Sequence, residues 1–235
     1  TKLLGVMMND IKYANLLEST FIHLKGISRD KEKALWDSGI VHISQLKEHY
    51  FSREITLFDE YKDPATETEQ AIAQKNLAYF ANKLPHHELY RAALSWYRDV
   101  MFLDIETTGL SRCYSYITLI GWIIDGQYKC IVKGESPETL FEDLKKSKII
   151  VTFNGSMFDL PFIRKELPNA DIPQAHIDLR FFSKRHGYTG GQKAIEKTLK
   201  VRRPKILDDV DGKEAVVLWY KYLSGDLNSL DLLLK

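Results

Sequence analysis

Residues 101–110, MFLDIETTGL, place two carboxylates at the end of an apolar run. Asp104 and Glu106 are two residues apart, so on a strand their side chains point to the same face of the sheet. Adjacent carboxylates repel each other unless a cation lies between them. Because oxygen-only ligands suit Mg²⁺ or Mn²⁺, this spacing predicts a metal site. The alternative is a strand that simply ends at a polar surface.

A second apolar run, VTFNGSMFDLPFI at 151–163, ends in the same manner. Its strand ends at Asn154, turns through Gly155 and Ser156, and a helix begins beside Asp159. An aspartate in the first turn of a helix is often only a partner of the helix dipole. Parallel neighbours in a sheet bring their carboxyl ends together, however, so Asp159 is expected to join the first two carboxylates. Such a cluster can hold two metal ions and promote hydrolysis of a phosphodiester.

The elements that must position these residues form an alternating pattern. Strand-length apolar runs occupy 99–106, 116–124, 128–132, 148–154 and 175–179. An Asp-Gly pair at 125–126 predicts a hairpin between the second and third of these runs. Helices are expected at 137–147, 158–167, 189–199 and 214–223. The pattern predicts a mixed α/β sheet covered by helices.

The preceding part of the chain has a different pattern, which predicts a small helical domain at 1–95 and an α/β domain at 96–235. Helices are expected at 14–24 and, as one long helix, at 62–85. Residues 21–40 look like a single helix-hairpin-helix element with its turn at Lys25, Gly26 and Ile27. Such a turn can present amide groups to a phosphate, and a copy kept only for packing is the alternative.

Composition limits the possible classes of protein. The net charge is +1, so affinity for nucleic acid must come from local patches. No apolar run reaches the length of a membrane span, and we expect no membrane association. Cys113 and Cys130 lack a CxxC spacing, which is consistent with reduced thiols and a cytoplasmic location. Because the chain ends inside an apolar, helix-like pattern, we expect a C-terminal extension or a larger protein.

Together, FLDIETTGL and FNGSMFDLPFI resemble the first two motifs of the DnaQ-like (DEDD) 3′–5′ exonucleases in the RNase H-like superfamily. The Asn-x₃-Phe-Asp form is closest to the proofreading domains of family-B DNA polymerases. The stretch 98–235 is similar to a stand-alone microbial branch of the superfamily. The resemblance implies an RNase H-like mixed five-stranded sheet with flanking helices. It also implies a metal-dependent exonuclease that releases nucleoside monophosphates from DNA or RNA, with a single-stranded 3′ end as its partner.

The resemblance assigns roles to individual residues. The positions that match metal ligands are Asp104, Glu106 and Asp159, which would hold two Mg²⁺ or Mn²⁺ ions in the complete site. The positions that match contacts to the terminal nucleotide are Thr107, Thr108, Leu110, Asn154 and Phe158. The threonines would lie near its sugar, and Leu110 would wedge against its base. A core role is the alternative for Phe158.

A basic segment at 180–205 could neutralise phosphates and make binding sensitive to salt. Within it, Lys193 begins a predicted helix after two glycines, and helix N-termini attract phosphate. The alternative is a solvated helix face.

The third motif of the family, Tyr-x₃-Asp or His-x₄-Asp on a late helix, is missing from its expected place. Tyr222 and Asp226 have the first spacing, but Gly225 lies between them. One hypothesis places the fourth carboxylate beyond Lys235, in which case this chain alone is inactive. Another is a catalytically incomplete RNase H-like module that binds nucleic acid.

Overall fold

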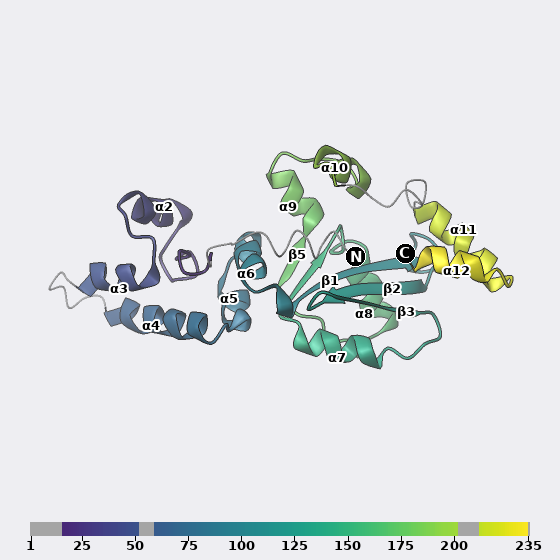
Figure 1. The fold of residues 1–235 in the computed structure, drawn as a ribbon, viewed down its shortest axis with the longest axis horizontal. Helices are drawn as coiled ribbons and strands as arrows, with labels where there is room; N and C mark the ends of the chain where they lie inside the picture. Colours follow the sequence, from purple (N-terminus) through teal and green to yellow (C-terminus); the bar gives the residue numbers. More distant parts are fainter. Residues whose placement is uncertain (1–15, 52–58, 202–211, 235) are drawn as a thin grey trace. The chain divides into compact units, whose positions relative to one another are not determined.

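The computed structural model describes residues 16–51, 59–201 and 212–234. The chain forms two compact units, Thr1–Val100 and Met101–Lys235, which are described separately below (Figure 1). The described elements of the first unit are helical. They are α2 (Arg29–Asp37), α3 (Ile43–Phe51), α4 (Asp59–Ala73), α5 (Leu77–Lys83), η1 (His86–Glu88), α6 (Leu89–Ser95) and η2 (Tyr97–Asp99).

The helix expected before the Lys25 turn is not observed. Residues 16–27 instead run as successive turns, so the helix-hairpin-helix reading holds only for the turn and for α2. The physical reason is a buried side chain. The backbone amides of Phe21 and Ile22 donate to Oε1 of Glu32, at 2.6 and 3.0 Å, and are therefore not available for helical hydrogen bonds.

The long helix expected at 62–85 is two helices. Lys75 adopts a left-handed conformation with φ of 51°, which ends the α4 segment. Asn76 then caps α5, because its side chain accepts a hydrogen bond from the amide of Tyr79 at 3.2 Å. The apolar pattern continues across this break and does not reveal it.

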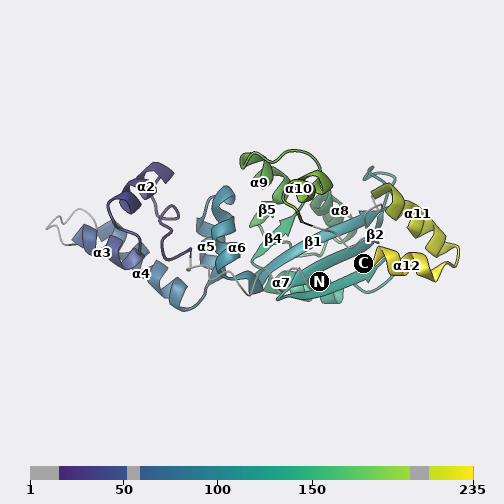
Figure 2. The same cartoon turned by 45° about the horizontal axis from the view of Figure 1, so that its top comes forward.

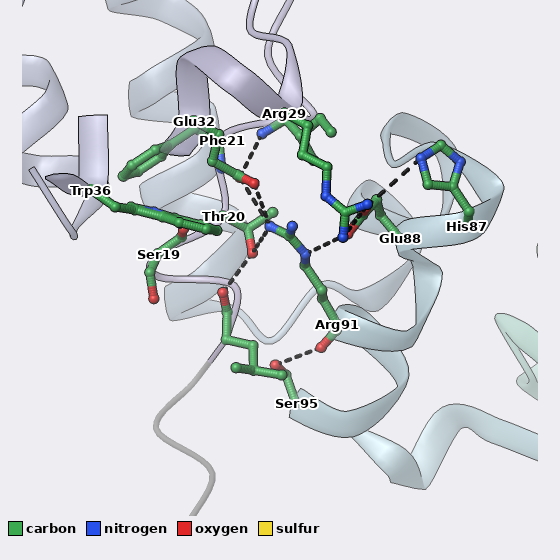
Figure 3. A network of polar contacts seen from close by, with 12 residues as sticks. Ser19, Thr20, Phe21, Arg29, Glu32, Trp36, His87, Glu88, Arg91 and Ser95 are labelled. Atoms are coloured by element: carbon green, nitrogen blue, oxygen red, sulfur yellow. Dashed lines mark hydrogen bonds and ion pairs between the residues drawn. The ribbon is translucent and has the colours of Figure 1, made fainter. Parts of the chain in front are cut away.

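A buried ion network joins three parts of the first unit (Figure 3). Arg91 lies between two carboxylates that are almost fully buried, Glu32 and Glu88. Its Nη1 is 2.9 Å from Glu32 and its Nε is 2.7 Å from Glu88. Arg29 and His87 approach Glu88 more loosely, at 3.6 and 3.8 Å. The network connects α2, the preceding turns and α6.

The second unit contains a five-stranded sheet with the order β3-β2-β1-β4-β5. Its strands are β1 (Val100–Thr107), β2 (Ile117–Ile124), β3 (Gln127–Val132), β4 (Ile149–Thr152) and β5 (His176–Asp178). The β2 strand is antiparallel to both β1 and β3, whereas β4 and β5 are parallel. The expected mixed five-stranded sheet is therefore confirmed.

Two helices, α7 (Glu138–Lys146) and α8 (Asp159–Glu166), pack on the sheet. The core contains Leu103 and Ile105 of β1, together with Leu140 of α7 and Leu160 of α8. Strand alternation therefore turns the intervening residues of β1 to the other face. That face carries the two acidic residues.

The remaining helices are α9 (Leu179–Arg185), α10 (Gln192–Thr198), α11 (Gly212–Leu223) and α12 (Leu227–Leu233). The last two lie side by side (Figures 1 and 2). Hydrogen bonds connect these two helices to Tyr116, which precedes β2, and to Tyr128 of β3. Trp219 donates to Tyr116 Oη at 3.2 Å, and Tyr128 Oη donates to the carbonyl of Leu234 at 3.4 Å.

Candidate active site

The β1 strand presents Asp104 and Glu106 on one face. Across the β1–β2 pair, Asp104 lies opposite Gly121 and Glu106 opposite Leu119. The pairing register shifts immediately after Glu106, which indicates a bulge or irregularity there. Irregularities of this kind are common beside functional sites, because they redirect side chains. Asp104 and Glu106 alternate with buried residues along β1, so the two acids lie on one face of the sheet, as predicted.

Asp159 begins α8 and is only 2% exposed. Its Oδ1 accepts a hydrogen bond from the backbone amide of Ile105 at 3.1 Å. Since Ile105 lies between the two acids of β1, this bond ties the start of α8 to the strand at the level of those acids.

One groove of about 790 Å³ brings most of the candidate residues together. Its lining includes these site candidates: Asp104, Glu106, Asn154, Phe158, Asp159 and Lys193. Apolar residues of the sheet and of α12 complete the walls, among them Phe102, Ile123 and Leu232. The groove therefore has an acidic centre within largely apolar walls.

Two of the acids in this groove have raised pKa values. Burial, followed by repulsion from Asp104 and Asp159, raises the pKa of Glu106 to about 7. Burial and repulsion from Asp104 likewise raise the pKa of Asp159 to about 7, although its hydrogen bond from Ile105 partly opposes the shift. Asp104 thus disfavours ionisation of both Glu106 and Asp159. Bound positive charge would relieve this repulsion.

The three carboxylates suit a divalent metal by chemistry, since all their donor atoms are oxygens and they repel one another. Within the described residues, no three His, Cys, Asp or Glu side chains converge closely enough to form a ligand set.

Three other candidates lie outside the groove lining. Thr107 is buried, and its hydroxyl donates to the carbonyl of Gly109 at 2.7 Å. The hydroxyl of Thr108 accepts a hydrogen bond from the amide of Tyr116 at 3.1 Å. Both threonines therefore hold the conformation of the loop after β1. The side chain of Leu110, in the same loop, is 85% exposed to solvent.

Phe158 and Asn154 come from the turn between β4 and α8. The Phe158 ring lines the groove and also packs against Phe162, with ring centroids 5.1 Å apart. Its core and groove roles thus coexist. Asn154 has a φ of 64°, which is uncommon for a residue other than glycine. Lys193 is the second residue of α10.

Sequence reasoning missed several residues near the acids. Tyr128 lines the groove, and its Oη would lie 3.3 Å from a Cβ atom added at Gly121. Burial, followed by the nearby Cys130 and Asp104, raises the pKa of Tyr128 to about 12. Asp178 and Arg180 contact the turn that carries Asn154. For Asp178, a signal was available, because it lies on the last strand as Asp104 lies on the first.

Asp226, the candidate for the third motif, caps a helix. Its Oδ1 accepts from the amide of Asn228 at 3.1 Å, and its Oδ2 accepts from the hydroxyl of Ser229 at 2.7 Å. Gly225 precedes it with a φ of 102°, which separates α11 from α12. Tyr222 and Asp226 therefore do not share a helix, unlike the residues of the motif.

Among the helices that the structure describes, none combines the length and apolar character that a membrane span requires. The solved structures that are similar to the chain include the following two. The family B DNA polymerase from the hyperthermophilic archaeon Pyrobaculum calidifontis has 13% identity and a TM-score of 0.45, covering 57% of this chain and 22% of the polymerase. The Aedes aegypti Nibbler EXO domain has 11% identity and a TM-score of 0.37, covering 58% of this chain and 86% of that domain.

No curated protein sequence matches the chain. A family model described as the RNase_H superfamily matches residues 101–235, which include the whole sheet except its first residue. This match confirms the superfamily that the two acidic motifs indicated. The chain belongs to the RNase_H superfamily.

Proposed function

We propose that the chain is a metal-dependent 3′–5′ exonuclease that hydrolyses phosphodiester bonds of DNA or RNA. The observation that carries the proposal is the groove lined by Asp104, Glu106 and Asp159, in which burial and the Asp104 carboxylate raise the pKa of Glu106 and of Asp159. Membership of the RNase_H superfamily supports a nuclease in general. The 3′–5′ direction rests on the resemblance of the two motifs to DEDD exonucleases. Residues 96–235 would carry the activity, with 1–95 as an accessory helical domain.

Asp104, Glu106 and Asp159 are the residues that would hold Mg²⁺ or Mn²⁺, with two ions in the complete site. Bound metal supplies Lewis acidity and neutralises charge that develops during phosphodiester hydrolysis. The protein supplies the remaining features. The groove holds the strand end, and Lys193 offers a positive charge to phosphate.

A second function has its own support. Asp226, the candidate for the third motif, is engaged in a helix cap and does not share a helix with Tyr222. These observations favour a module that binds nucleic acid without cutting it. The basic segment at 180–205 would then carry the binding, and affinity would fall with salt.

The first prediction separates these two functions. The chain is incubated with Mn²⁺ and 5′-labelled single-stranded DNA or RNA, and the products are resolved by length. The exonuclease proposal predicts stepwise shortening from the 3′ end, which Asp104→Ala abolishes because a metal ligand is lost. Asp171→Ala, which removes an exposed acid outside the groove, should retain the activity.

Binding without cleavage, unaffected by Asp104→Ala, would support the non-catalytic module instead. If the chain neither cuts nor binds either nucleic acid at low salt, both functions are wrong. Equal digestion by the wild type and the Asp104→Ala variant would overturn the site assignment.

A further inference from the structure

The turn between β4 and α8 places Asn154 and Asp159 in the groove, and its backbone has an unfavourable feature. The left-handed conformation of Asn154 costs free energy in a residue with a side chain. Such a conformation persists only where the surrounding structure holds it. Hydrogen bonds to residues at the end of β5 and the start of α9 provide this restraint.

Asp178 ties the turn to β5 through its carboxylate. Its Oδ1 accepts from the amide of Asn154 at 2.8 Å, and its Oδ2 accepts from the amide of Ser156 at 3.1 Å. The hydroxyl of Ser156 donates to the same Oδ2. Asp178 also caps α9 by accepting from the amide of Arg180 at 3.1 Å. A single half-buried carboxylate therefore fixes both the turn and the helix that follows.

Arg180 fixes the side chain of Asn154. Its Nη1 lies 2.7 Å from Oδ1 of Asn154. Because a guanidinium can only donate, the atom facing it must be the amide oxygen, which settles the orientation of the carboxamide. Within the described part of the chain, no atom accepts a hydrogen bond from Nδ2 of Asn154. This amino group therefore remains able to donate to a ligand in the groove.

We infer that Asp178 and Arg180 are positioning residues that set Asn154 as a hydrogen-bond donor toward bound nucleic acid. The inference rests on the proposed function for its ligand, which is an acceptor oxygen of the sugar or phosphate at the strand end. Asp178 sets the backbone of Asn154, and Arg180 sets its amide. Arg180 is exposed, so the competing role is a direct phosphate contact of its own.

A double-mutant cycle distinguishes these roles. The probe is a 5′-fluorescein single-stranded DNA whose terminal linkage is a hydrolysis-resistant phosphorothioate, and affinity is read from fluorescence anisotropy with Mn²⁺ present. The variants are Arg180→Met, Asn154→Ala and their combination. Arg185→Met on the same helix removes an equal, exposed charge and so measures the effect of charge alone.

The inference predicts that Arg180→Met weakens binding about tenfold more than Arg185→Met, as expected for a charge-assisted hydrogen bond. Adding Asn154→Ala to Arg180→Met should cause little further loss, because the two act as a unit. Arg180→Lys keeps a donor and should recover part of the affinity. If the two substitutions instead reduce affinity independently, so that the double variant loses the product of the two single fold-changes, the inference is overturned and Arg180 is a direct contact.

A second readout does not depend on ligand. In the protein without nucleic acid, the side-chain amide signals of Asn154 are followed by ¹⁵N NMR. They should shift and exchange faster in Arg180→Met and Asp178→Asn, but not in Arg185→Met. Unchanged signals would overturn the inference. If wild type fails to bind the DNA, the proposed function fails, and these signals still decide whether Arg180 positions the amide.

Discussion

At the scale of single residues, the ionisation of Glu106 couples metal binding to stability. Its raised pKa means that the native protein disfavours the charged form, so above pH 7 this carboxylate costs stability. The cost disappears at low pH, where the side chain is neutral in both native and unfolded states. Metal would offset it at neutral pH. The site is therefore expected to be destabilising until it is filled.

Glu106→Gln should consequently stabilise the metal-free protein at pH 8, by about 2 kcal/mol. Urea unfolding monitored in EDTA measures this change. The same variant should lose most of the stabilisation that Mn²⁺ gives the wild type, because a ligand is missing. Destabilisation of the metal-free protein by Glu106→Gln would contradict the origin proposed for the raised pKa.

His23 provides the pH dependence of the first unit. Burial, followed by the positive charges of Lys83 and Arg91, lowers its pKa from 6.5 to about 3. Its Nε2 lies 2.9 Å from the hydroxyl of Thr68, and its Nδ1 is buried without a hydrogen-bond partner. The ring is therefore held neutral in the native protein.

Stability from this neutral ring is fully present above pH 6.5, the unfolded pKa, and is lost as the pH falls toward 3. Between pH 7 and pH 5, the unfolding free energy of the first unit should drop by about 2 kcal/mol from this residue. Urea titrations followed by the indole NMR signals of Trp36 and Trp96 measure it. His23→Gln should flatten the pH dependence, and an unchanged slope would rule out His23 as its source.

At the scale of elements, the β4–α8 turn depends on Gly155. A Cβ atom at this position would lie 2.1 Å from Oγ1 and 2.5 Å from Cβ of Thr152. That threonine hydroxyl also accepts a hydrogen bond from the amide of Gly155 at 3.0 Å and lies 2.8 Å from Nε2 of His176. The close approach of backbone to side chain is what brings the turn over the end of β4.

Gly155→Ala should therefore destabilise the second unit by about 3 kcal/mol, since Thr152 is buried and has little room to move. Thermal unfolding followed by circular dichroism tests this. Gly212→Ala is the matched control, because an added Cβ there has no neighbour within 4 Å. A similar effect of the two substitutions would exclude the predicted clash.

The sequence predicted elements correctly where an apolar pattern was followed by residues that end a strand or form a turn. Runs of alternating or continuous apolar residues predicted all five strands, and the Asp-Gly pair located the β2–β3 hairpin. The helix α9 was not expected, because it is only seven residues long, buries none of its side chains and starts from the cap that Asp178 supplies. The turns at 16–27 were also missed, because a distant carboxylate takes their amides.

The site shows the same division. The carboxylates at 104, 106 and 159 could be inferred from their spacing and position on elements, and they line one groove. The bonds from Asp178 and Arg180 could not, since they depend on which strands pair and join residues 24 and 26 apart. Local spacing predicts which residues could act, whereas strand order determines what holds them.

At the scale of the whole molecule, each unit buries ionisable side chains, but the proportion of acidic to basic groups differs between the two units. In the second unit, repulsion from Asp104 and Asp159 adds to burial in raising the pKa of Glu106. In the first, Arg91 lies between two buried carboxylates. Burying ions is costly unless they are paired, so Arg91 is expected to be essential for folding of its unit.

Arg91→Met should destabilise the first unit by about 3–5 kcal/mol, because it leaves Glu32 and Glu88 without their main cation. The unfolding free energy from urea titration gives the value. Lys83→Met breaks the partly exposed pair with Glu67 and should cost less than about 1 kcal/mol. Comparable losses in the two variants would show that the buried network contributes no more than a surface pair.

Gly121 has a consequence for how the groove could be studied in a living cell. It lies opposite Asp104, and the space above it is bordered by the Tyr128 hydroxyl. A bulky β-branched residue at this position suits a strand but would obstruct the groove. Such an allele would block access while leaving every acidic side chain in place. Comparing its phenotype with that of an acid-to-alanine allele would separate the role of ligand entry from that of the carboxylates themselves.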